Sequence, residues 1–588
     1  MYKTLFTNNM KQNFIIYYVN LLFIFMGCQS IEKKITFIDG ATRGNSHFIH
    51  VGKSTQGQWW LIDSNGRPFF YKGVCAINRA GTAGGRRAKP GKYAITIDKK
   101  YNYQQAPDSF VNSSITYLKK LRFNALGAWT TEEFYNKGIF FTEILEFFYE
   151  GPYFNATKLP DIFSSEWEYA IDKKARALCS PLRESKDLVG YFTDNEIGFG
   201  NINTSEFDLG FKAGDFKPTL LRQLLELPEE KEAFQAAAKF VIERHGNNFK
   251  ELSNNWGLDI PNWDSFRSWS KKKLPIQGEA YKKDTEAFVG YYASCYFKKA
   301  NKAIKRYDPN HLILGCRFGA PPPKEILSAI IPWTDVISVN NYQPILYERY
   351  DSIYKQSEIP FLIGEFSWNT PLYKEVLFPS EKTSQMDMKE RMFKRGETTL
   401  KRAALQDGFV GYTWYRWVQH KAVEPKFSDG IVDYEDNPSI HNDMLKNINK
   451  DMETLRIKYA NGKWKQAEIN NGEMTFFFNK LRKNWDHYVR VEFKNGKPIK
   501  DNFGWKTHLM ILDFKSDSDG VFMKFKINFN QGNTSNDVPE SSGTYEIRMI
   551  RNNEIFTGEL IGQYEGEKIK GNVKAYYFPQ LEISDTIQ

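Results

Sequence analysis

The sequence predicts an α/β protein: a (β/α)8 TIM barrel followed by a C-terminal antiparallel β domain, either a sandwich or a small barrel. Between about residues 67 and 455, eight short apolar runs alternate with helical patterns. Continuous apolar runs are typical of parallel strands buried on both faces. An open doubly wound sheet is the alternative, which the absence of a GxGxxG motif after the first run disfavours.

The predicted strands are short and apolar, and most are separated by amphipathic segments. The strands are Pro68–Ile77, Phe123–Trp129, Gly138–Phe148, Leu188–Phe192, Leu312–Phe318, Val336–Asn341, Pro360–Phe366 and Phe409–Trp417. The helices between them are Phe110–Leu121, Glu166–Ala177, Asp284–Tyr307, Lys324–Ile330 and Met386–Gln406. The repeated alternation favours a closed barrel.

Two further segments flank or interrupt the barrel pattern. Trp59–Phe70 predicts a hairpin around an Asn-Gly turn that leads into the first strand. A long insertion follows the fourth strand and contains Trp256, Trp263 and Trp269. Insertions at this position lie on the catalytic face of a barrel, so we expect this one to wall a substrate cleft. Packing of these tryptophans within the insertion's own core is an equally good interpretation.

After about residue 458 the pattern changes from continuous apolar runs to strict alternation. Tyr545–Ile550 and Glu554–Tyr564 alternate apolar and polar residues, and Asn-Gly pairs mark several turns. This predicts a separate antiparallel domain. The expected organisation is a signal in residues 1–27, a linker and hairpin in 28–66, the barrel in 67–457 with its insertion in 201–283, and the β domain in 458–588.

The N-terminal segment predicts an export signal. Positive charges at Lys3 and Lys11 accompany the apolar run Phe14–Met26, which is shorter than the roughly 20 residues of a membrane-spanning helix. The following Gly27-Cys28 resembles the lipobox of bacterial lipoproteins. That resemblance implies lipidation of Cys28 and a protein anchored by lipid in the periplasm or outer membrane. An ordinary secretory signal with an incidental cysteine is the alternative.

Composition narrows the classes of function. The net charge of +10 over 588 residues permits an anionic partner without requiring one. The basic residues form no stripe or recognised motif, which disfavours nucleic-acid binding. Widely spaced cysteines and eight scattered histidines show no metal-ligand spacing, so we expect no catalytic metal or other cofactor. An aromatic share of 16% supplies both core and stacking platforms for ligands.

Two carboxylates end otherwise apolar strands. Glu196 follows the fourth strand and Glu365 ends the seventh. Active sites of (β/α)8 barrels are built at the C-terminal ends of strands, and burying a carboxylate without partners is costly. A capped or paired surface carboxylate would explain either residue alone. Two of them at equivalent positions on strands four and seven favour a catalytic pair.

The placement of these two carboxylates resembles glycoside hydrolase clan A, and more narrowly the family 50 β-agarases and related red-algal galactan hydrolases. The resemblance extends from about residue 55 to residue 450. The stretches that carry it are Trp59–Val74, Leu118–Thr130, Lys186–Phe199, Leu312–Pro321, Asp335–Pro344, Pro360–Trp368 and Gly411–Gln419. The C-terminal β domain has no counterpart in that pattern, and we expect no N-terminal carbohydrate-binding module of the kind common in agarases within these 588 residues.

The resemblance implies roles for individual residues. Glu196 would be the general acid/base and Glu365 the nucleophile of a retaining mechanism, with carboxyl groups about 5–5.5 Å apart. Asn195 would bind the sugar 2-hydroxyl, and Tyr342 would donate a hydrogen bond to Glu365. Arg317 could orient Glu365 or bind a substrate sulfate or hydroxyl. Further substrate-binding candidates are Trp414 as an aromatic floor, Trp129 and Asn78. A plain salt bridge for Arg317 and a core position for Tyr342 remain alternatives.

We therefore expect an exported, lipid-anchored retaining glycosidase that cleaves β-galactosidic bonds of an agarose-type polysaccharide. A sulfated galactan of the porphyran, furcellaran or carrageenan type is the alternative substrate, suggested by the basic balance and by Arg86, Arg87 and Lys89 in a glycine-rich loop. A non-catalytic surface glycan-binding lipoprotein is the alternative outside enzymes. The presence of both carboxylates argues against it.

Overall fold

The computed structural model describes residues 35–84, 87–153, 159–197, 219–270, 278–343, 345–367, 396–419, 430–439, 442–482, 485–504, 507–529 and 541–582. Cys28 and Arg86 lie outside these residues, as do all of 201–218 and residues 386–395 of the predicted helix Met386–Gln406. Within the described residues, no helix has the length and apolar character needed to cross a membrane.

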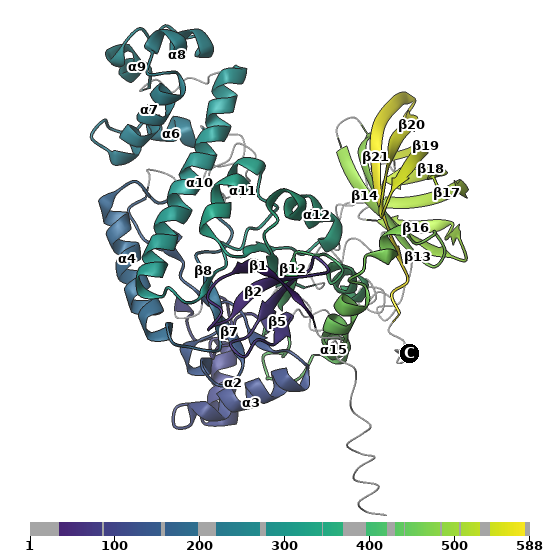
Figure 1. Ribbon diagram of the computed structural model, residues 1–588, viewed down its shortest axis with the longest axis horizontal. Coiled ribbons are helices and arrows are strands. Elements are labelled where there is room, and N and C mark those ends of the chain that lie inside the picture. Colours follow the sequence, from purple (N-terminus) through teal and green to yellow (C-terminus); the bar gives the residue numbers. More distant parts are fainter. Residues whose placement is uncertain are drawn as a thin grey trace, which may run out of the picture. The chain divides into compact units, whose positions relative to one another are not determined.

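The predicted barrel is confirmed (Figure 1). Its strands are β5 Tyr71–Val74, β6 Ala125–Leu126, β7 Phe140–Ile144, β8 Leu188–Phe192, β9 Leu312–Ile313, β10 Ile337–Asn340, β11 Phe361–Phe366 and β12 Phe409–Trp414. All neighbours pair in parallel in the order β10-β11-β12-β5-β6-β7-β8-β9. A parallel bridge between Phe318 and Val339 joins the two ends of this sheet.

Two barrel strands are much shorter than the apolar runs that predict them. In the fifth run, Gly315 has φ 73° and Arg317 has φ 50°, so the chain turns out of the extended conformation after Ile313. In the second run, Trp129 has φ 62° and follows the two-residue strand β6. At these left-handed residues the backbone leaves the extended conformation, so the pairing between strands does not continue.

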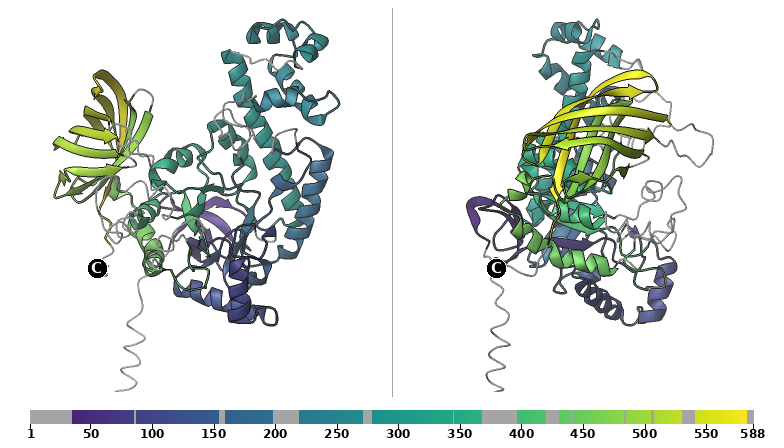
Figure 2. Two further views of the ribbon diagram at one scale, coloured as in Figure 1. Left: turned by 180° about the vertical axis from the view of Figure 1, so that it is seen from behind. Right: turned by 90° about the vertical axis from the view of Figure 1, so that its right-hand side faces the viewer.

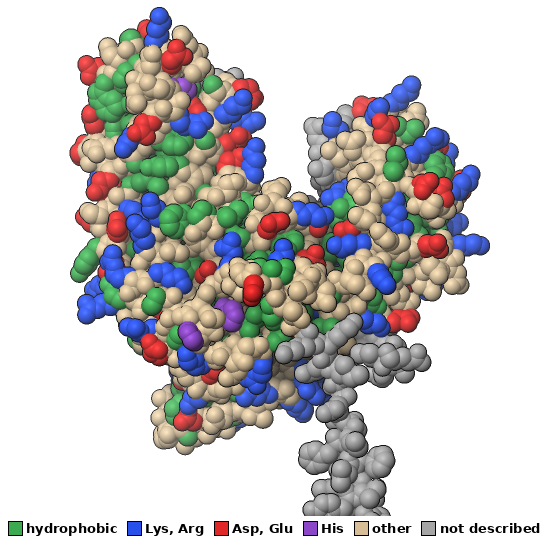
Figure 3. Space-filling view, in the orientation of Figure 1, with side chains coloured by type: hydrophobic (Ala, Val, Ile, Leu, Met, Phe, Trp, Pro, Cys, Tyr) green, Lys and Arg blue, Asp and Glu red, His purple; other side chains and the backbone are tan. Residues whose placement is uncertain are grey.

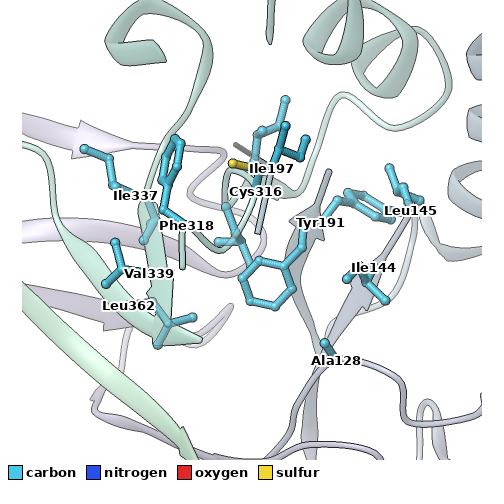
Figure 4. Packing of buried hydrophobic residues seen from close by; sticks show 14 of the residues in the cluster. Ala128, Ile144, Leu145, Tyr191, Ile197, Cys316, Phe318, Ile337, Val339 and Leu362 are labelled. Carbon is cyan, nitrogen blue, oxygen red and sulfur yellow. The ribbon is translucent and has the colours of Figure 1, made fainter. Parts of the chain in front are cut away.

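Apolar side chains on several barrel strands belong to one large buried cluster. Figure 4 shows Ile144 of β7, Tyr191 of β8, Val339 of β10 and Leu362 of β11 in one cluster with Phe318. These side chains are almost fully buried. The barrel is therefore closely packed between its strands and its outer helices.

The helices around the barrel follow the expected alternation. They are α2 Lys92–Tyr101, α3 Pro107–Lys120, α4 Ser165–Cys179, α10 Glu279–Tyr307, α11 Lys324–Ile330, α12 Leu346–Ser357 and α15 Asn442–Lys458. Helix α4 begins at an N-cap, Ser164, whose side chain accepts from the Trp167 amide. The hydrophobicity pattern did not predict helix α12, because this helix buries the charged side chains Glu348 and Asp351.

The insertion forms helices α6 Leu220–Leu225, α7 Glu232–Arg244, α8 Phe249–Trp256 and α9 Trp263–Ser270. Trp256 donates its indole N–H to Asp284 of α10, and its ring meets those of Trp269 and Tyr281 at 5.3 and 5.1 Å. Trp256 and Trp269 are buried. These tryptophans therefore pack the insertion against α10 instead of presenting open platforms.

Shorter strands precede the barrel: β1 Phe37–Arg43, β2 His50–Ser54, β3 Trp59–Ile62 and β4 Pro68–Phe69. Strands β3 and β4 form the hairpin around the Asn-Gly turn, with Leu61 opposite Phe69. The buried Arg456 of α15 donates to the carbonyls of Trp59 and Asp407, both at 2.8 Å. This arginine ties the hairpin to the barrel.

The C-terminal domain is a nearly closed antiparallel sheet (Figure 2). Its strands are β13 Gly472–Arg482, β14 Trp485–Lys494, β15 Lys497–Pro498, β16 Asp501–Gly504, β17 Thr507–Ser516, β18 Gly520–Phe529, β19 Ser541–Asn552, β20 Ile555–Tyr564 and β21 Glu567–Pro579. Their order is β15-β14-β13-β21-β20-β19-β18-β17-β16. Alternate residues such as Phe476, Phe478 and Tyr545 fill its own core.

Candidate active site

Glu196 reaches the mouth of the barrel on the short segment that follows β8. The Thr193 amide donates to the Gly315 carbonyl at 2.8 Å, which holds this segment beside the chain after β9. Glu196 itself has φ 54°, and its side chain is exposed. Its Oε1 accepts a hydrogen bond from Nδ2 of Asn340 at 2.9 Å. The carboxyl group is therefore oriented yet open to solvent.

Glu365 lies inside β11 and is only 5% exposed. Nη2 of Arg317 stands 3.0 Å from its Oε1, and the hydroxyl of Tyr342 donates to its Oε2. Each carboxylate oxygen thus has its own partner. Two fixed donors on a buried carboxylate hold one orientation and favour the ionised form.

Asn340 lies beside Glu365 in the sheet and is hydrogen-bonded to Glu196. Its Cα stands opposite that of Glu365 in the β10–β11 register, and its amide donates to Glu196. The same amide nitrogen lies 3.0 Å from Oδ1 of Asn195. The ends of β8, β10 and β11 therefore bring Asn195, Glu196, Tyr342 and Glu365 into one cluster.

The two carboxyl groups experience different electrostatic surroundings. Burial is the main cause that raises the pKa of Glu365 to a net value of about 7, and the negative charge of Glu196 contributes in the same direction. The positive charge of Arg317 and the hydrogen bond from Tyr342 oppose that shift. Glu365 therefore titrates near neutrality, and its ionised form is available at neutral and alkaline pH.

Arg317 is a fully buried cation beneath the site. Besides Glu365, its Nη2 donates to the Gly364 carbonyl at 2.8 Å, and its guanidinium lies 4.4 Å from the ring centroid of Trp129. A Cβ at position 364 would stand 2.9 Å from Nε of Arg317 and 2.8 Å from Oδ1 of Asn340. Only glycine leaves room for the arginine there. Arg317 therefore contacts the carboxylate from below, and we assign it to positioning instead of substrate binding.

Trp129 extends this network toward the surface. Its Nε1 donates to Oε1 of Glu146 at 3.2 Å, and Arg87 pairs with the same carboxylate. The Arg87 guanidinium lies 4.3 Å from the ring centroid of Tyr149, which is exposed. Trp129 is 8% exposed, so it supports Arg317 more than it offers a face to a ligand.

The predicted aromatic floor is misplaced by one residue. Trp414 is completely buried, with its ring centroid 6.3 Å from that of Phe366. Trp417 points to Tyr93, whose hydroxyl accepts from its indole at 2.9 Å. Tyr415, half-buried between them, has its ring 6.4 Å from Tyr342 and is the aromatic side chain at the site. Alternation of side chains along a strand explains why a neighbour of Trp414 faces the opening.

Asn78 serves the loop after β5 and not an open subsite. Its Nδ2 donates to the carbonyls of Thr82 and Trp129, both at 2.9 Å, and its Oδ1 accepts from the Gly81 amide. The side chain is 1% exposed. These bonds occupy its amide group and join the loop after β5 to the backbone of Trp129.

Three residues of the cluster were not singled out from the sequence. Asn340 sits in the run Val336–Asn341, where two consecutive asparagines at the end of an apolar strand were a usable signal. Tyr415 was overlooked because it lies between Trp414 and Trp417 in the sequence. Glu146 follows β7 in a left-handed conformation, φ 55°, that sequence periodicity does not reveal.

The cluster has the chemistry of a carboxylate pair. Among the described residues, no group of three or more His, Cys, Asp or Glu is arranged to hold a metal ion. Figure 3 shows basic and acidic side chains interspersed over the visible face, so the positive net charge does not form one field there. The site instead offers one buried, oriented carboxylate and one exposed carboxylate.

The curated proteins whose sequences resemble this chain are β-agarases. No protein-family model matches the sequence. Beta-agarase B of Vibrio sp. (strain JT0107) is 23% identical over 391 residues, which cover 62% of this chain and 39% of the relative. Beta-agarase A of the same strain is 23% identical over 446 residues, covering 62% of this chain and 41% of the relative. The chain resembles the family 50 β-agarases.

Solved structures agree with that resemblance at the level of the fold. An exo-beta-agarase superposes with a TM-score of 0.58 at 21% identity, over 72% of this chain and 67% of that chain. The agarase AgWH50C gives a TM-score of 0.57 at 22% identity, over 72% and 67%. The chain spans about two fifths of the length of the curated β-agarases that it matches. The likeness to agarases expected from the sequence stretches is confirmed.

Proposed function

We propose that the protein is a retaining glycoside hydrolase that cleaves β-galactosidic bonds in an agarose-type galactan. The observation that carries the proposal is the pair of strand-end carboxylates in unlike surroundings. Glu365 is buried between Arg317 and Tyr342, whereas Glu196 is exposed and held by Asn340. The likeness to β-agarases supports the substrate class.

In the first step, an oxygen of ionised Glu365 attacks the anomeric carbon while the bond to the leaving oxygen breaks. Glu196 gives its proton to that oxygen, which leaves as a free hydroxyl on one sugar fragment. The product is a glycosyl ester of Glu365, and Glu196 is now ionised. Arg317 and Tyr342 hold Glu365 so that it need not reorganise.

In the second step, Glu196 accepts a proton from water as the water oxygen attacks the anomeric carbon. The ester bond to Glu365 breaks, and both carboxyl groups return to their starting states. Asn195 lies next to Glu196 and is half-buried, where its amide can reach the 2-hydroxyl of the reacting sugar. Two inversions give net retention of the anomeric configuration.

The test is a panel of galactans incubated with wild type, Glu196→Gln and Glu365→Gln. We expect new reducing ends from agarose with wild type and losses of roughly 10²-fold or more with either variant. Proton NMR of the first product should show the β anomer before mutarotation. Unchanged turnover in either variant, or an α anomer formed first, would contradict the proposal.

A sulfated galactan is the second candidate substrate, and Arg87 is the described cation that favours it. Its side chain is half exposed at the mouth of the site, but its guanidinium is paired with Glu146. An ester sulfate would have to compete with that carboxylate. We therefore propose the uncharged chain as the preferred substrate, and the same panel ranks the sulfated ones.

We also propose that the protein is exported and lipidated at Cys28, on the signal-like character of residues 1–27. Incorporation of labelled palmitate in a bacterial host tests this. Wild type should be labelled and Cys28→Ser should not. Equal labelling of both would contradict lipidation at this cysteine.

A further inference from the structure

The outer face of the C-terminal sheet carries a continuous row of side chains across four neighbouring strands. Phe477 of β13 stands opposite Tyr488 of β14 on one side and Lys574 of β21 on the other. Thr557 of β20 continues the row opposite Lys574. Their sequence neighbours Phe476 and Phe478 point inward to the core of the sheet. The row therefore faces outward by strand alternation.

One part of this outer face is already used for packing. Tyr576 and Phe578, further along β21, are buried against Tyr347 of α12 and Trp464. The ring of Tyr347 lies 5.0 Å from that of Phe578, and the Tyr576 hydroxyl donates to Asp351 at 3.2 Å. These contacts fix the sheet against the barrel helix α12.

The other part of the same face borders a cavity of about 660 Å³. Its lining combines the side chains of the row with Asn572 of the sheet and Ile345 at the start of α12. Phe477 and Tyr488 are half-buried, so their rings retain open surface. A volume of this size falls within the range of ligand pockets, about 300–1,000 Å³.

A direct contact connects this cavity to the candidate active site. The hydroxyl of Tyr488 donates to Oε1 of Gln343 at 3.2 Å. Gln343 directly follows Tyr342, the residue whose hydroxyl holds Glu365. The cavity and the candidate active site are thus joined by the adjacent residues Tyr342 and Gln343.

We propose that this cavity is an accessory subsite that binds units of the galactan chain beyond those at the carboxylates. Rings of Phe477 and Tyr488 offer apolar faces on which the C–H face of a sugar stacks, and Asn572, Thr557 and Lys574 offer hydrogen-bonding groups for its hydroxyls. The inference rests on the proposed function for the identity of the chain. Because both sites belong to one compact unit of the chain, occupancy of one raises the effective concentration of the polysaccharide at the other.

The test compares Phe477→Ala and Tyr488→Ala with Phe522→Ala, a half-buried aromatic on β18 outside the cavity lining. Thr557→Trp, which fills the cavity from an exposed position, provides a variant that removes no packing. Each is measured for kcat/KM on agarose and on the shortest oligosaccharide that wild type cleaves. Retardation in agarose-containing native gels is measured in the Glu365→Gln background, and circular dichroism monitors folding.

We expect Phe477→Ala, Tyr488→Ala and Thr557→Trp to lose about tenfold in kcat/KM on agarose and to migrate faster in the gel, while the shortest substrate is unaffected. Phe522→Ala should match wild type. Equal migration and unchanged polymer kinetics in all variants would overturn the subsite. Gel retardation that the cavity variants abolish, in a protein that cleaves no galactan, would uphold the subsite and refute the hydrolase. Loss of activity on short and long chains alike would show a structural role and also overturn the subsite.

Discussion

Glu196 and Glu365 are the same side chain at the ends of two barrel strands, β8 and β11, yet their surroundings differ in almost every respect. Glu365 is 5% exposed, with an arginine on one oxygen and a tyrosine on the other. Glu196 is exposed, with an asparagine amide on one oxygen. A fixed, desolvated carboxylate suits attack on carbon, and an accessible one suits exchange of protons with substrate and water.

The difference has a local cause in the backbone. Glu365 lies within β11, and its partners Arg317 and Tyr342 stand on the segments that directly follow β9 and β10, so it is enclosed at the ends of neighbouring strands. Glu196 comes four residues after its strand ends and adopts a left-handed conformation, φ 54°. Environment, more than residue type, therefore separates the two proposed roles.

The largest predicted effect comes from removing the two carboxylates in turn. Glu365→Gln should lower kcat by roughly 10⁴-fold or more on every substrate, because the covalent step is lost. Glu196→Gln should lose roughly 10²- to 10⁴-fold on agarose but far less on an aryl glycoside whose leaving group needs no proton. Steady-state kinetics on both substrates checks this. The reverse pattern would exchange the two roles.

The next test of the difference between the two glutamates is Arg317, which is buried and contacts Glu365. Arg317→Met should lower kcat/KM by roughly 10²-fold at neutral pH, since the pKa of Glu365 rises further once its counterion is gone. The acid limb of the pH profile should move to higher pH, with partial recovery of activity in alkali.

A matched control for Arg317 is Arg456→Met, which removes another fully buried arginine from α15. It should lower the free energy of unfolding by about 3 kcal/mol without moving the acid limb, because Arg456 contacts backbone carbonyls far along the chain from the carboxylates. Denaturant unfolding and pH profiles separate the two outcomes. An unshifted acid limb in Arg317→Met would contradict the assigned contact.

The positions of the two carboxylates were predictable from the sequence because of periodicity, whereas their difference in burial was not. Apolar runs of fixed period reveal strands, and a carboxylate that ends such a run is conspicuous, as Glu196 and Glu365 are. The wider resemblance supplied their roles. The two-residue strands β6 and β9 were overestimated because left-handed residues such as Arg317 leave no mark in hydrophobicity.

Side-chain direction was the part that the sequence could not determine. The resemblance favoured Trp414 as the aromatic floor, but the direction of each side chain at this strand end depends on the strand's rotation, which the sequence does not determine. Asn78 shows the same limit. The sequence placed Asn78 after the first strand, but it did not show that the side chain is hydrogen-bonded to backbone groups of Gly81 and Thr82.

Tyr342 offers a smaller and more specific test of the Glu365 environment. Its hydrogen bond favours the ionised carboxylate, so Tyr342→Phe should raise the pKa of Glu365 above about 7. Because the nucleophile must be ionised, the acid limb of kcat/KM should shift upward by about one pH unit, as expected for loss of one charge-assisted hydrogen bond. Tyr415→Phe, in the neighbouring ring, is the control and should leave the limb in place.

The smallest predicted effect separates two contacts of Trp129, its hydrogen bond to Glu146 and its cation–π contact with Arg317. Trp129→Phe keeps a ring near the guanidinium and loses only the hydrogen bond to Glu146, so kcat/KM should fall by about fivefold or less. Trp129→Leu also loses the cation–π contact and should fall further, by about tenfold in total. The acid limb should rise in the leucine variant alone, since only there does Arg317 lose a contact that holds it against Glu365. Equal pH profiles for both variants would mean that Trp129 acts on the site through packing and not through the arginine.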